Sequence, residues 1–324
     1  MEKSFLTVFC TLLFCLNVLA LSPAEAAKNA LTQNSSPWMP FRAENNVFYS
    51  ASELRHIAKG ELAGGNIVKV AATTRKQNAN PTVALKKFND QLNSLDIKLI
   101  VMPIPPKMAI YPFAGIAAGD AAKYLQPFYS ELRNQGIDIL DMTDIFVKNA
   151  AVLPYCRTDA HWSPTGIELA VRELAKKISL RGDKKFAYLE KELSISGDLA
   201  VSSSNGESEK ETIKLKSVKD NVFAENSPIL VIGDSHTLIF SSGKDMLAEK
   251  SGLCELLAVE IGLPIDRIGI KGSAASAVRM DLFRKATKKT EWLKNKKYII
   301  YCFSSREFTE ATSGWASIPV IRYK

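Results

Sequence analysis

Several motifs that identify common classes of enzyme are missing from this chain of 324 residues. There is no GxxxxGK phosphate loop, no HExxH motif and no CxxC pair, so the usual signatures of nucleotide and metal sites are excluded. The stretch Gly269-Ile-Lys-Gly272 lacks the third glycine of a dinucleotide-binding loop. Beyond the first 25 residues no apolar run is long enough to cross a bilayer, which excludes a transporter with several membrane spans.

Cysteine is also scarce, with five residues in the whole chain. Three of them, Cys156, Cys254 and Cys302, lie beyond the N-terminal segment at spacings that fit neither a small disulfide scaffold nor a metal site. We expect buried free thiols, with one disulfide as the alternative in an oxidising compartment.

Apolar sequence, in contrast, is plentiful, and the charge is moderately basic. Hydrophobic residues make up 46% and charged residues 23% of the chain, so it can bury a large core. There are 42 Lys and Arg residues against 34 Asp and Glu residues, which gives a formal net charge of +8. That excess suits an anionic partner and leaves a polymer, a membrane surface and nucleic acid open.

Residues 1–26 are predicted to be a targeting segment. Lys3 supplies a positive charge, residues 5–21 form an apolar run, and Ala24-Glu25-Ala26 is a cleavage pattern. Cleavage after Ala26 would release an exported chain. The alternative is an uncleaved signal anchor, because the apolar run falls just short of a usual membrane span of about 20 residues.

Residues 27–37 are small and polar and predict a linker, which leaves residues 38–324 as one folded domain. Within that domain apolar runs alternate with amphipathic stretches, a pattern typical of an α/β fold with a mostly parallel sheet covered on both faces. Strands are predicted at residues 66–70, 97–103, 137–140, 229–232, 267–270 and 298–303, with helices between them. Residues 196–227, rich in Ser, Lys and Glu, interrupt the pattern and predict a surface insertion or a small hairpin.

The clearest chemical signal is the sequence Gly233-Asp-Ser-His236, which directly follows one of the apolar strands. Ser235 would lie at the carboxyl end of a parallel strand and near the start of a helix, where such sheets bind ligands. Gly233 permits a tight turn there, and the backbone N–H of Ser235 is a candidate donor for an oxyanion. The alternative interpretation is an ordinary turn that opens a helix.

A serine nucleophile needs a base, and the base needs a carboxylate that orients it. Among only three histidines, His161 lies two residues after Asp159, a spacing that places both side chains on one face of an extended chain. His236 is the competing base, but sequence neighbours such as Ser235 and His236 usually point apart, so we predict a cleft-lining or helix-start residue. His56 is predicted to be a surface residue. The alternative for Asp159 is a residue that only caps a turn.

These motifs together resemble the SGNH-hydrolase-like domain of alginate O-acetyltransferases of the AlgJ/AlgX type. The resemblance extends over residues 38–310, and the blocks Asp159-Ala-His-Trp162 and Gly233-Asp-Ser are its most specific parts. As in that family, the Asp and His precede the Ser in the chain. The other motifs that support this resemblance lie at residues 101–112, 157–166, 262–266, 271–274 and 298–308.

The resemblance implies a three-layer sandwich fold and a role for each member of the proposed triad. Ser235 would be the nucleophile, His161 the general base and then acid, and Asp159 the residue that orients the imidazole. Candidates for oxyanion or substrate contacts are Gly272, Ser273, Arg306, Arg157 and Tyr111. The stretch 271–274 has fewer glycines than the family pattern, which weakens the assignment of a second oxyanion donor.

The resemblance also implies the reaction. An acetyl group would pass through an acetyl-serine to a hydroxyl of an exported polysaccharide, alginate or a similar polymer, without a metal or other cofactor. A membrane-bound O-acyltransferase would supply the acetyl group in the periplasm, where the N-terminal segment could hold the protein at the inner membrane; nucleic acid is not an expected partner. Two alternatives stay open: a periplasmic carbohydrate acetyl esterase, and a non-catalytic polysaccharide-binding subunit of an export complex.

Overall fold

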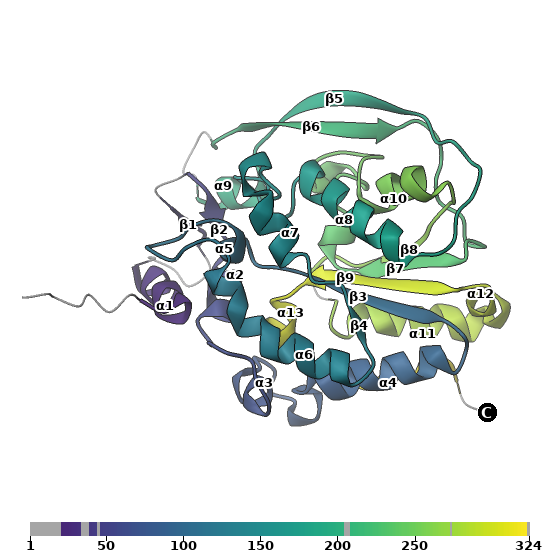
Figure 1. Cartoon of the computed structure of the whole chain (residues 1–324), viewed down its shortest axis with the longest axis horizontal. Helices are drawn as coiled ribbons and strands as arrows, with labels where there is room; N and C mark the ends of the chain where they lie inside the picture. Colours follow the sequence, from purple (N-terminus) through teal and green to yellow (C-terminus); the bar gives the residue numbers. More distant parts are fainter. Residues whose placement is uncertain (1–20, 34–38, 44–45, 204–207, 273, 323–324) are drawn as a thin grey trace, which may run out of the picture.

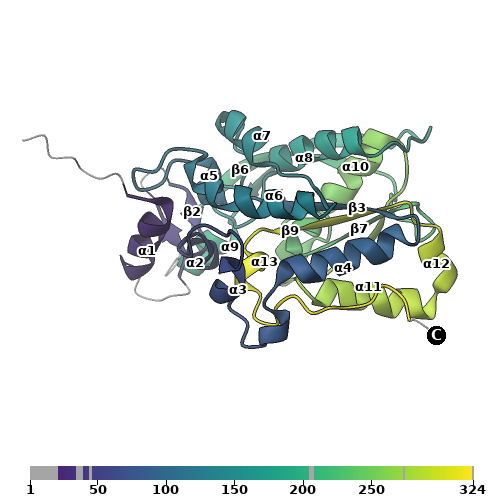
Figure 2. The same ribbon diagram turned by 60° about the horizontal axis from the view of Figure 1, so that its bottom comes forward.

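A central parallel sheet lies between two layers of helices, as the alternation in the sequence predicts (Figures 1 and 2). The structure is a computed structural model that describes residues 21–33, 39–43, 46–203, 208–272 and 274–322. The sheet has five strands in the order β4-β3-β9-β7-β8, and all of its pairings are parallel. This is the predicted α/β class.

The strands of the central sheet are β3 (Lys98–Ile104), β4 (Asp138–Ile139), β7 (Ile229–Gly233), β8 (Asp266–Gly269) and β9 (Tyr298–Ser304). Outside it, β1 (Phe41–Arg42) pairs antiparallel with β2 (Phe48–Tyr49), and β5 (Tyr188–Ile195) with β6 (Glu211–Val218). All residues of β7 are buried. Such strands appear in the sequence as continuous apolar runs because helices cover both of their faces.

Helices α8 (Pro164–Lys177) and α10 (Leu253–Ile261) pack together on one face, and α4 (Pro81–Asn93) and α11 (Ala277–Lys288) cover the other (Figure 2). Helix α6 (Gln126–Asn134) lies beside the edge strand β4. The other α-helices are α1 (Pro23–Gln33), α2 (Ala51–Ile57), α3 (Asn66–Val70), α5 (Lys107–Ile110), α7 (Thr143–Lys148), α9 (Asp198–Ser203), α12 (Thr290–Lys294) and α13 (Glu307–Glu310). Short 3-10 helices are η1 (Lys76–Asn78), η2 (Asp120–Leu125), η3 (Ala150–Val152), η4 (Ser235–Thr237) and η5 (Lys244–Met246).

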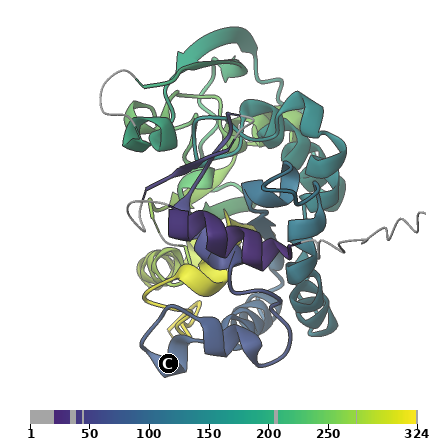
Figure 3. The same cartoon turned by 90° about the vertical axis from the view of Figure 1, so that its left-hand side faces the viewer.

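The end of the molecule toward which the sheet strands point carries additional short elements. Figure 3 looks onto this end, where α1 and the β1–β2 pair lie in front of the strands. The β5–β6 pair instead lies over α8 and α10, at the top of Figure 1, away from the sheet. The surface insertion or small hairpin was predicted at residues 196–227, but only β6 lies in that range, because β5 ends at Ile195.

Three local predictions are wrong. Asn66–Val70, predicted as a strand, is helix α3, in which Ile67 alone is buried; a short apolar run does not distinguish a strand from one turn of helix. The predicted linker at 27–37 is helical up to Gln33, because an alanine-rich segment favours helix and buries three alanines against neighbouring elements. His56 is fully buried rather than on the surface, and its Nδ1 lies 2.7 Å from Thr309 Oγ1.

Other predictions concern the N-terminus and the cysteines. None of the described helices is both long and apolar enough to span a membrane. Residues 1–20, most of the predicted targeting segment, lie outside the described residues, as do residues 34–37 of the predicted linker, so the signal peptide or anchor stays a prediction. Its predicted cleavage position, after Ala26, falls within α1. Cys156, Cys254 and Cys302 are buried free thiols, as expected.

Candidate active site

Strand β7 carries Ser235 to the carboxyl edge of the sheet. The strand ends at Gly233, and η4 begins at Ser235, whose exposed fraction is only 9%. A Cβ atom on Gly233 would lie 1.8 Å from the backbone oxygen of Cys302 in β9. Only glycine therefore lets β7 turn toward η4 while it stays paired with β9.

Asp234 fixes this turn from both sides. Its Oδ1 accepts a hydrogen bond of 2.9 Å from the backbone N–H of His236, and its Oδ2 accepts one of 2.8 Å from Ser304 N at the end of β9. Burial disfavours its charged form, but the charge of His236 and these hydrogen bonds lower the pKa of Asp234 to about 2. The carboxylate thus links the Ser235 turn to the neighbouring strand.

The structure brings together the three residues that the sequence predicted as a triad. Asp159 and His161 lie in the loop of residues 157–161, before α8, and His161 is 74 positions from Ser235 in the chain. His161 Nε2 lies 2.7 Å from Ser235 Oγ. On the other side of the ring, His161 Nδ1 lies 2.6 Å from Asp159 Oδ1. The three side chains therefore form a continuous hydrogen-bonded chain.

The electrostatics of this chain suit proton transfer. Burial disfavours the Asp159 carboxylate, but the hydrogen bond and positive charge of His161 lower the pKa of Asp159 to about 2. Burial alone would lower the pKa of His161, but its hydrogen bond to Asp159 raises that pKa above the ordinary value. With Nδ1–H directed at Asp159, Nε2 is free to accept a proton from Ser235 Oγ.

Lys107 supports the Asp159 backbone, a role that the sequence did not reveal. This lysine is only 1% exposed, and its Nζ donates hydrogen bonds of 2.6 Å to the backbone oxygen of Asp159 and 2.8 Å to that of Phe48. It begins helix α5, three residues after Ile104, where the apolar strand β3 ends. A lysine shortly after a mostly buried strand was the available signal, since buried lysines need partners.

His236 lies beside the chain without joining it. The centroids of its ring and that of His161 are 4.9 Å apart, and its Nδ1 lies 3.1 Å from Asp234 Oδ1. Burial lowers the pKa of His236, and the charge and hydrogen bond of Asp234 oppose that shift. Trp162 Nε1 donates a 3.2 Å hydrogen bond to the backbone oxygen of His236 and so joins the two halves of the site. His236 is thus a residue of the helix start, as predicted.

The oxyanion candidates lie on neighbouring turns. Gly272 is exposed in the turn after β8, with a backbone φ of 99°, and Ser273 lies outside the described residues. Arg306 follows β9, is half-buried, and its positive charge contributes to the lowered pKa of His236. The turn with Gly272 follows β8, which pairs in parallel with β7, and the roles of Gly272, Ser273 and Arg306 stay predictions.

The other two candidates for substrate contacts, Arg157 and Tyr111, make hydrogen bonds or ion pairs within the protein. The guanidinium of Arg157 pairs with the Glu209 carboxylate and donates a 3.2 Å hydrogen bond to the backbone oxygen of Asn46. The hydroxyl oxygen of Tyr111 accepts a 3.1 Å hydrogen bond from Tyr155 N. Substrate contacts by Arg157 or Tyr111 stay predictions, and binding would compete with these intramolecular contacts.

Among the described residues, one group of side chains is close enough to suggest a metal centre: the ligand atoms of Asp159, His161 and Asp198 lie within 4.8 Å of one another. Both Asp159 oxygens, however, already accept hydrogen bonds from N–H groups, at 2.9 Å from His161 N and at 3.0 Å from Asp198 N. Nδ1 of His161 is also directed at Asp159. This donor pattern fits a carboxylate that orients an imidazole better than a set of metal ligands.

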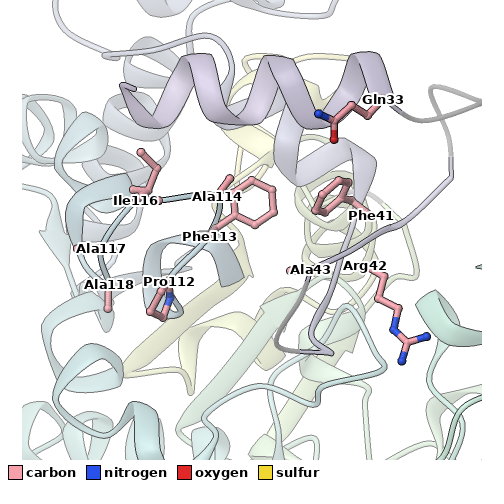
Figure 4. Close-up of a pocket in the computed structure, with 11 residues that line it drawn as sticks. Gln33, Phe41, Arg42, Ala43, Pro112, Phe113, Ala114, Ile116, Ala117 and Ala118 are labelled. Carbon is pink, nitrogen blue, oxygen red and sulfur yellow. The ribbon is translucent and has the colours of Figure 1, made fainter. Parts of the chain in front are cut away.

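A separate groove of about 1060 Å³ lies beneath α1, between the β1–β2 pair and the segment 112–118 (Figure 4). Phe41, Phe113 and Ile116 give it apolar walls, and Arg42 stands at its rim. None of the predicted site residues lines this groove. It is therefore distinct from the hydrogen-bonded chain at Ser235.

Comparisons with known proteins place the chain among acetyltransferase-type domains. A family model, described as the SGNH hydrolase-like domain of the acetyltransferase AlgX, matches residues 66–240, a range that includes Asp159, His161 and Ser235. A comparison with curated protein sequences found no match.

Two solved structures share the fold. The O-acetyltransferase domain of Pseudomonas putida AlgJ is 15% identical, with a TM-score of 0.60 over 84% of this chain and 92% of that chain. Pseudomonas aeruginosa AlgX is also 15% identical, with a TM-score of 0.55 over 86% of this chain and 65% of that chain. At such low identity these likenesses establish the SGNH-like α/β architecture.

Proposed function

The chain belongs to the family of SGNH hydrolase-like domains of the acetyltransferase AlgX, and from this premise we propose that it is a serine-dependent polysaccharide O-acetyltransferase. The observation that supports the proposal is the hydrogen-bonded chain Asp159–His161–Ser235 at the carboxyl edge of the sheet. A nucleophile, a base and an orienting carboxylate in this order are what acyl transfer through a covalent intermediate requires.

In the first step, His161 Nε2 takes the proton of Ser235 as Oγ attacks the carbonyl carbon of a bound acetyl ester. The tetrahedral intermediate collapses to acetyl-serine while His161 returns the proton to the leaving oxygen. Asp159 keeps the imidazole in the required tautomer and stabilises the imidazolium. The backbone N–H of Ser235 is proposed as one oxyanion donor, with Gly272 as the second and Arg306 as a substrate contact.

In the second step, His161 takes the proton of a sugar hydroxyl, whose oxygen attacks the acetyl-serine. The acetyl group moves to the sugar, and Ser235 recovers its proton from His161. Because water can replace the sugar hydroxyl, the same residues would also support ester hydrolysis. An acetyl esterase is thus the second candidate for this site.

We further propose an exported acidic polysaccharide, alginate or a similar polymer, as the acceptor. The net charge of +8 suits a polyanion. The N-terminal segment would direct the protein to the periplasm as a signal peptide or hold it at the inner membrane as an anchor. Acetyl-CoA is scarce outside the cytoplasm, so a membrane-bound O-acyltransferase would deliver the acetyl group.

The test combines an activated acetyl ester with an oligosaccharide acceptor. We expect purified protein to form an acetyl adduct on Ser235, seen by mass spectrometry, and to produce acetylated sugar when the acceptor is added. Ester release that is unaffected by the acceptor, with no acetylated sugar, would favour the esterase. Full polymer acetylation by S235A in cells that lack the native gene would instead favour a non-catalytic subunit. S242A, at an exposed serine of the following loop, is the matched control.

A further inference from the structure

We propose that Gly197, Asp198 and Glu211, at the inner ends of the β5–β6 pair, form a clamp that positions Asp159 for catalysis, with Glu211 as its main positioning residue. The inference rests on the proposed function of the Asp159–His161–Ser235 chain. It assigns a catalytic purpose to an insertion that takes no part in the central sheet (Figure 1).

Glu211, the first residue of β6, holds the backbone immediately before Asp159. Its Oε1 accepts hydrogen bonds of 2.7 Å from Thr158 N and 2.6 Å from Thr158 Oγ1. Its Oε2 accepts a hydrogen bond of 2.9 Å from Arg157 N. One carboxylate thus binds two successive peptide N–H groups, and hydrogen bonds to an ionised acceptor are stronger than neutral ones.

The segment that follows β5 holds the same loop from its other side. Asp198 N donates a 3.0 Å hydrogen bond to Asp159 Oδ2, and Asp198 Oδ1 accepts a 2.8 Å hydrogen bond from Ala160 N. Gly197 N donates a 3.1 Å hydrogen bond to Thr158 Oγ1. Since that hydroxyl also donates to Glu211, Thr158 connects the two sides of the clamp.

The clamp packs against the loop without space between them. A Cβ atom on Gly197 would lie 2.4 Å from the backbone carbonyl atoms of Thr158 and 2.5 Å from Asp159 Cβ. On its outer side, β6 is tied to α8 by an ion pair of 2.9 Å between Lys216 and Glu168. A shift of the clamp would therefore shift Asp159 relative to His161.

Asp159 Oδ1 and His161 Nδ1 are 2.6 Å apart, a contact that tolerates little displacement. Misplacement of a catalytic group by about 1 Å can cost about 100-fold in rate. We therefore expect E211A to lower kcat by about 10- to 100-fold while KM changes by less than about threefold, because both oxygens of the Glu211 carboxylate bind the 157–158 segment.

The pH profile distinguishes positioning from general damage to the fold. Asp159 raises the pKa of His161, and the other charges that act on the ring are those of Asp198 and Asp234, with the His236 ring 4.9 Å away. If Asp159 moves away, the pKa of His161 falls. The acidic limb of the kcat/KM profile would then shift to lower pH in E211A, a change that a purely structural role would not produce.

The experiment uses the full chain with an activated acetyl ester and compares wild type, E211A, E211Q, T158V and E192A. Glu192 is the matched control, because it lies exposed on β5 and pairs with Lys214 at 3.4 Å. We expect the lowered kcat and shifted acidic limb in E211A and E211Q, a smaller loss in T158V, and wild-type kinetics in E192A. If E211A does not fold, E211Q and T158V provide the same readouts.

Two results would overturn the clamp. One is a folded E211A or E211Q with the kcat and acidic limb of wild type. The other is a loss of activity with an unshifted limb, which would mean a purely structural role. S235A, assayed with the same ester, tests the proposed function independently of the clamp. If S235A still cleaves the ester, the proposed function is wrong, whatever the kinetics of the Glu211 variants.

Discussion

Replacing Asp159 by Asn tests the charge in the hydrogen-bonded chain with almost no change in volume. In the native protein, Oδ1 accepts hydrogen bonds of 2.9 and 2.6 Å from His161 N and Nδ1, and Oδ2 accepts one of 3.0 Å from Asp198 N. Every one of these partners is a donor. Whichever way the Asn amide is oriented, its NH2 group therefore faces an N–H group, and the carboxylate charge is lost.

The expected size of the effect follows from the position of the two charges. Centres of charge about 4 Å apart attract by about 4 kcal/mol at an effective dielectric constant of about 20. This attraction exists only when His161 is an imidazolium, as in the transition state of acetyl transfer. Its loss should slow acetylation of Ser235 by about 1000-fold, since each 1.36 kcal/mol corresponds to about tenfold in rate.

Stopped-flow measurement of the burst of leaving group from a nitrophenyl acetate ester reports this step directly. D90N is the matched control: Asp90 lies exposed on α4, where it pairs with Lys86 at 2.6 Å, and loss of such a surface ion pair is worth at most about 1 kcal/mol, or about fivefold. If D159N unfolds at the wild-type temperature and acetylates within tenfold of the wild-type rate, the assigned role of Asp159 is wrong.

Three further predictions follow from the same contacts. His161 must be neutral to act as a base and its pKa is raised, so acetylation should weaken as the pH falls through a value above 6.5, as a pH–rate profile would reveal. K107M should lower the free energy of unfolding by about 1–3 kcal/mol, because two buried carbonyls lose their donor; an unchanged denaturant midpoint would contradict this. G233A should destabilise the fold by about 1–3 kcal/mol or more through the clash with Cys302, whereas G65A, with open space around its Cβ, should not; calorimetry compares the two.

The sheet could be predicted because its strands are buried on both faces. A run such as that of β7 is apolar throughout, and helical spacing separates it from the next run. An apolar run also led us to predict a strand at Asn66–Val70, but this segment is a helix in which Ile67 alone is buried. Run length and hydropathy do not reveal whether one face or both faces of a segment will be covered.

The burial of His56 depended on contacts that no local pattern encodes. Helix α2 is amphipathic, but α1 and α13 pack against it, and Thr309 Oγ1 of α13 lies 2.7 Å from His56 Nδ1. These partners come from opposite ends of the chain. A polar residue on a short helix therefore looked solvent-exposed in the sequence although tertiary packing covers it.

The members of the candidate triad could be named from local motifs, but their partners in the structure could not. An Asp-x-His pair and a serine at a strand end each have a recognisable pattern. Glu211 lies in a polar, charged insertion that resembles ordinary surface sequence, and its contacts with Arg157 and Thr158 depend on where the β5–β6 pair returns to the loop. That return is a property of the assembled fold.

The site contains two Asp-x-His pairs with the same local geometry, and their environments decide which histidine acts as the base. In both pairs one carboxylate oxygen accepts from the backbone N–H and from Nδ1 of the histidine. His161 Nε2 reaches Ser235 at 2.7 Å, and its hydrogen bond to Asp159 outweighs burial and raises its pKa. Burial and the charge of His161 both lower the pKa of His236. Because the ring centroids are only 4.9 Å apart, protonation of one ring opposes protonation of the other, so the proton released by Ser235 should reside on His161.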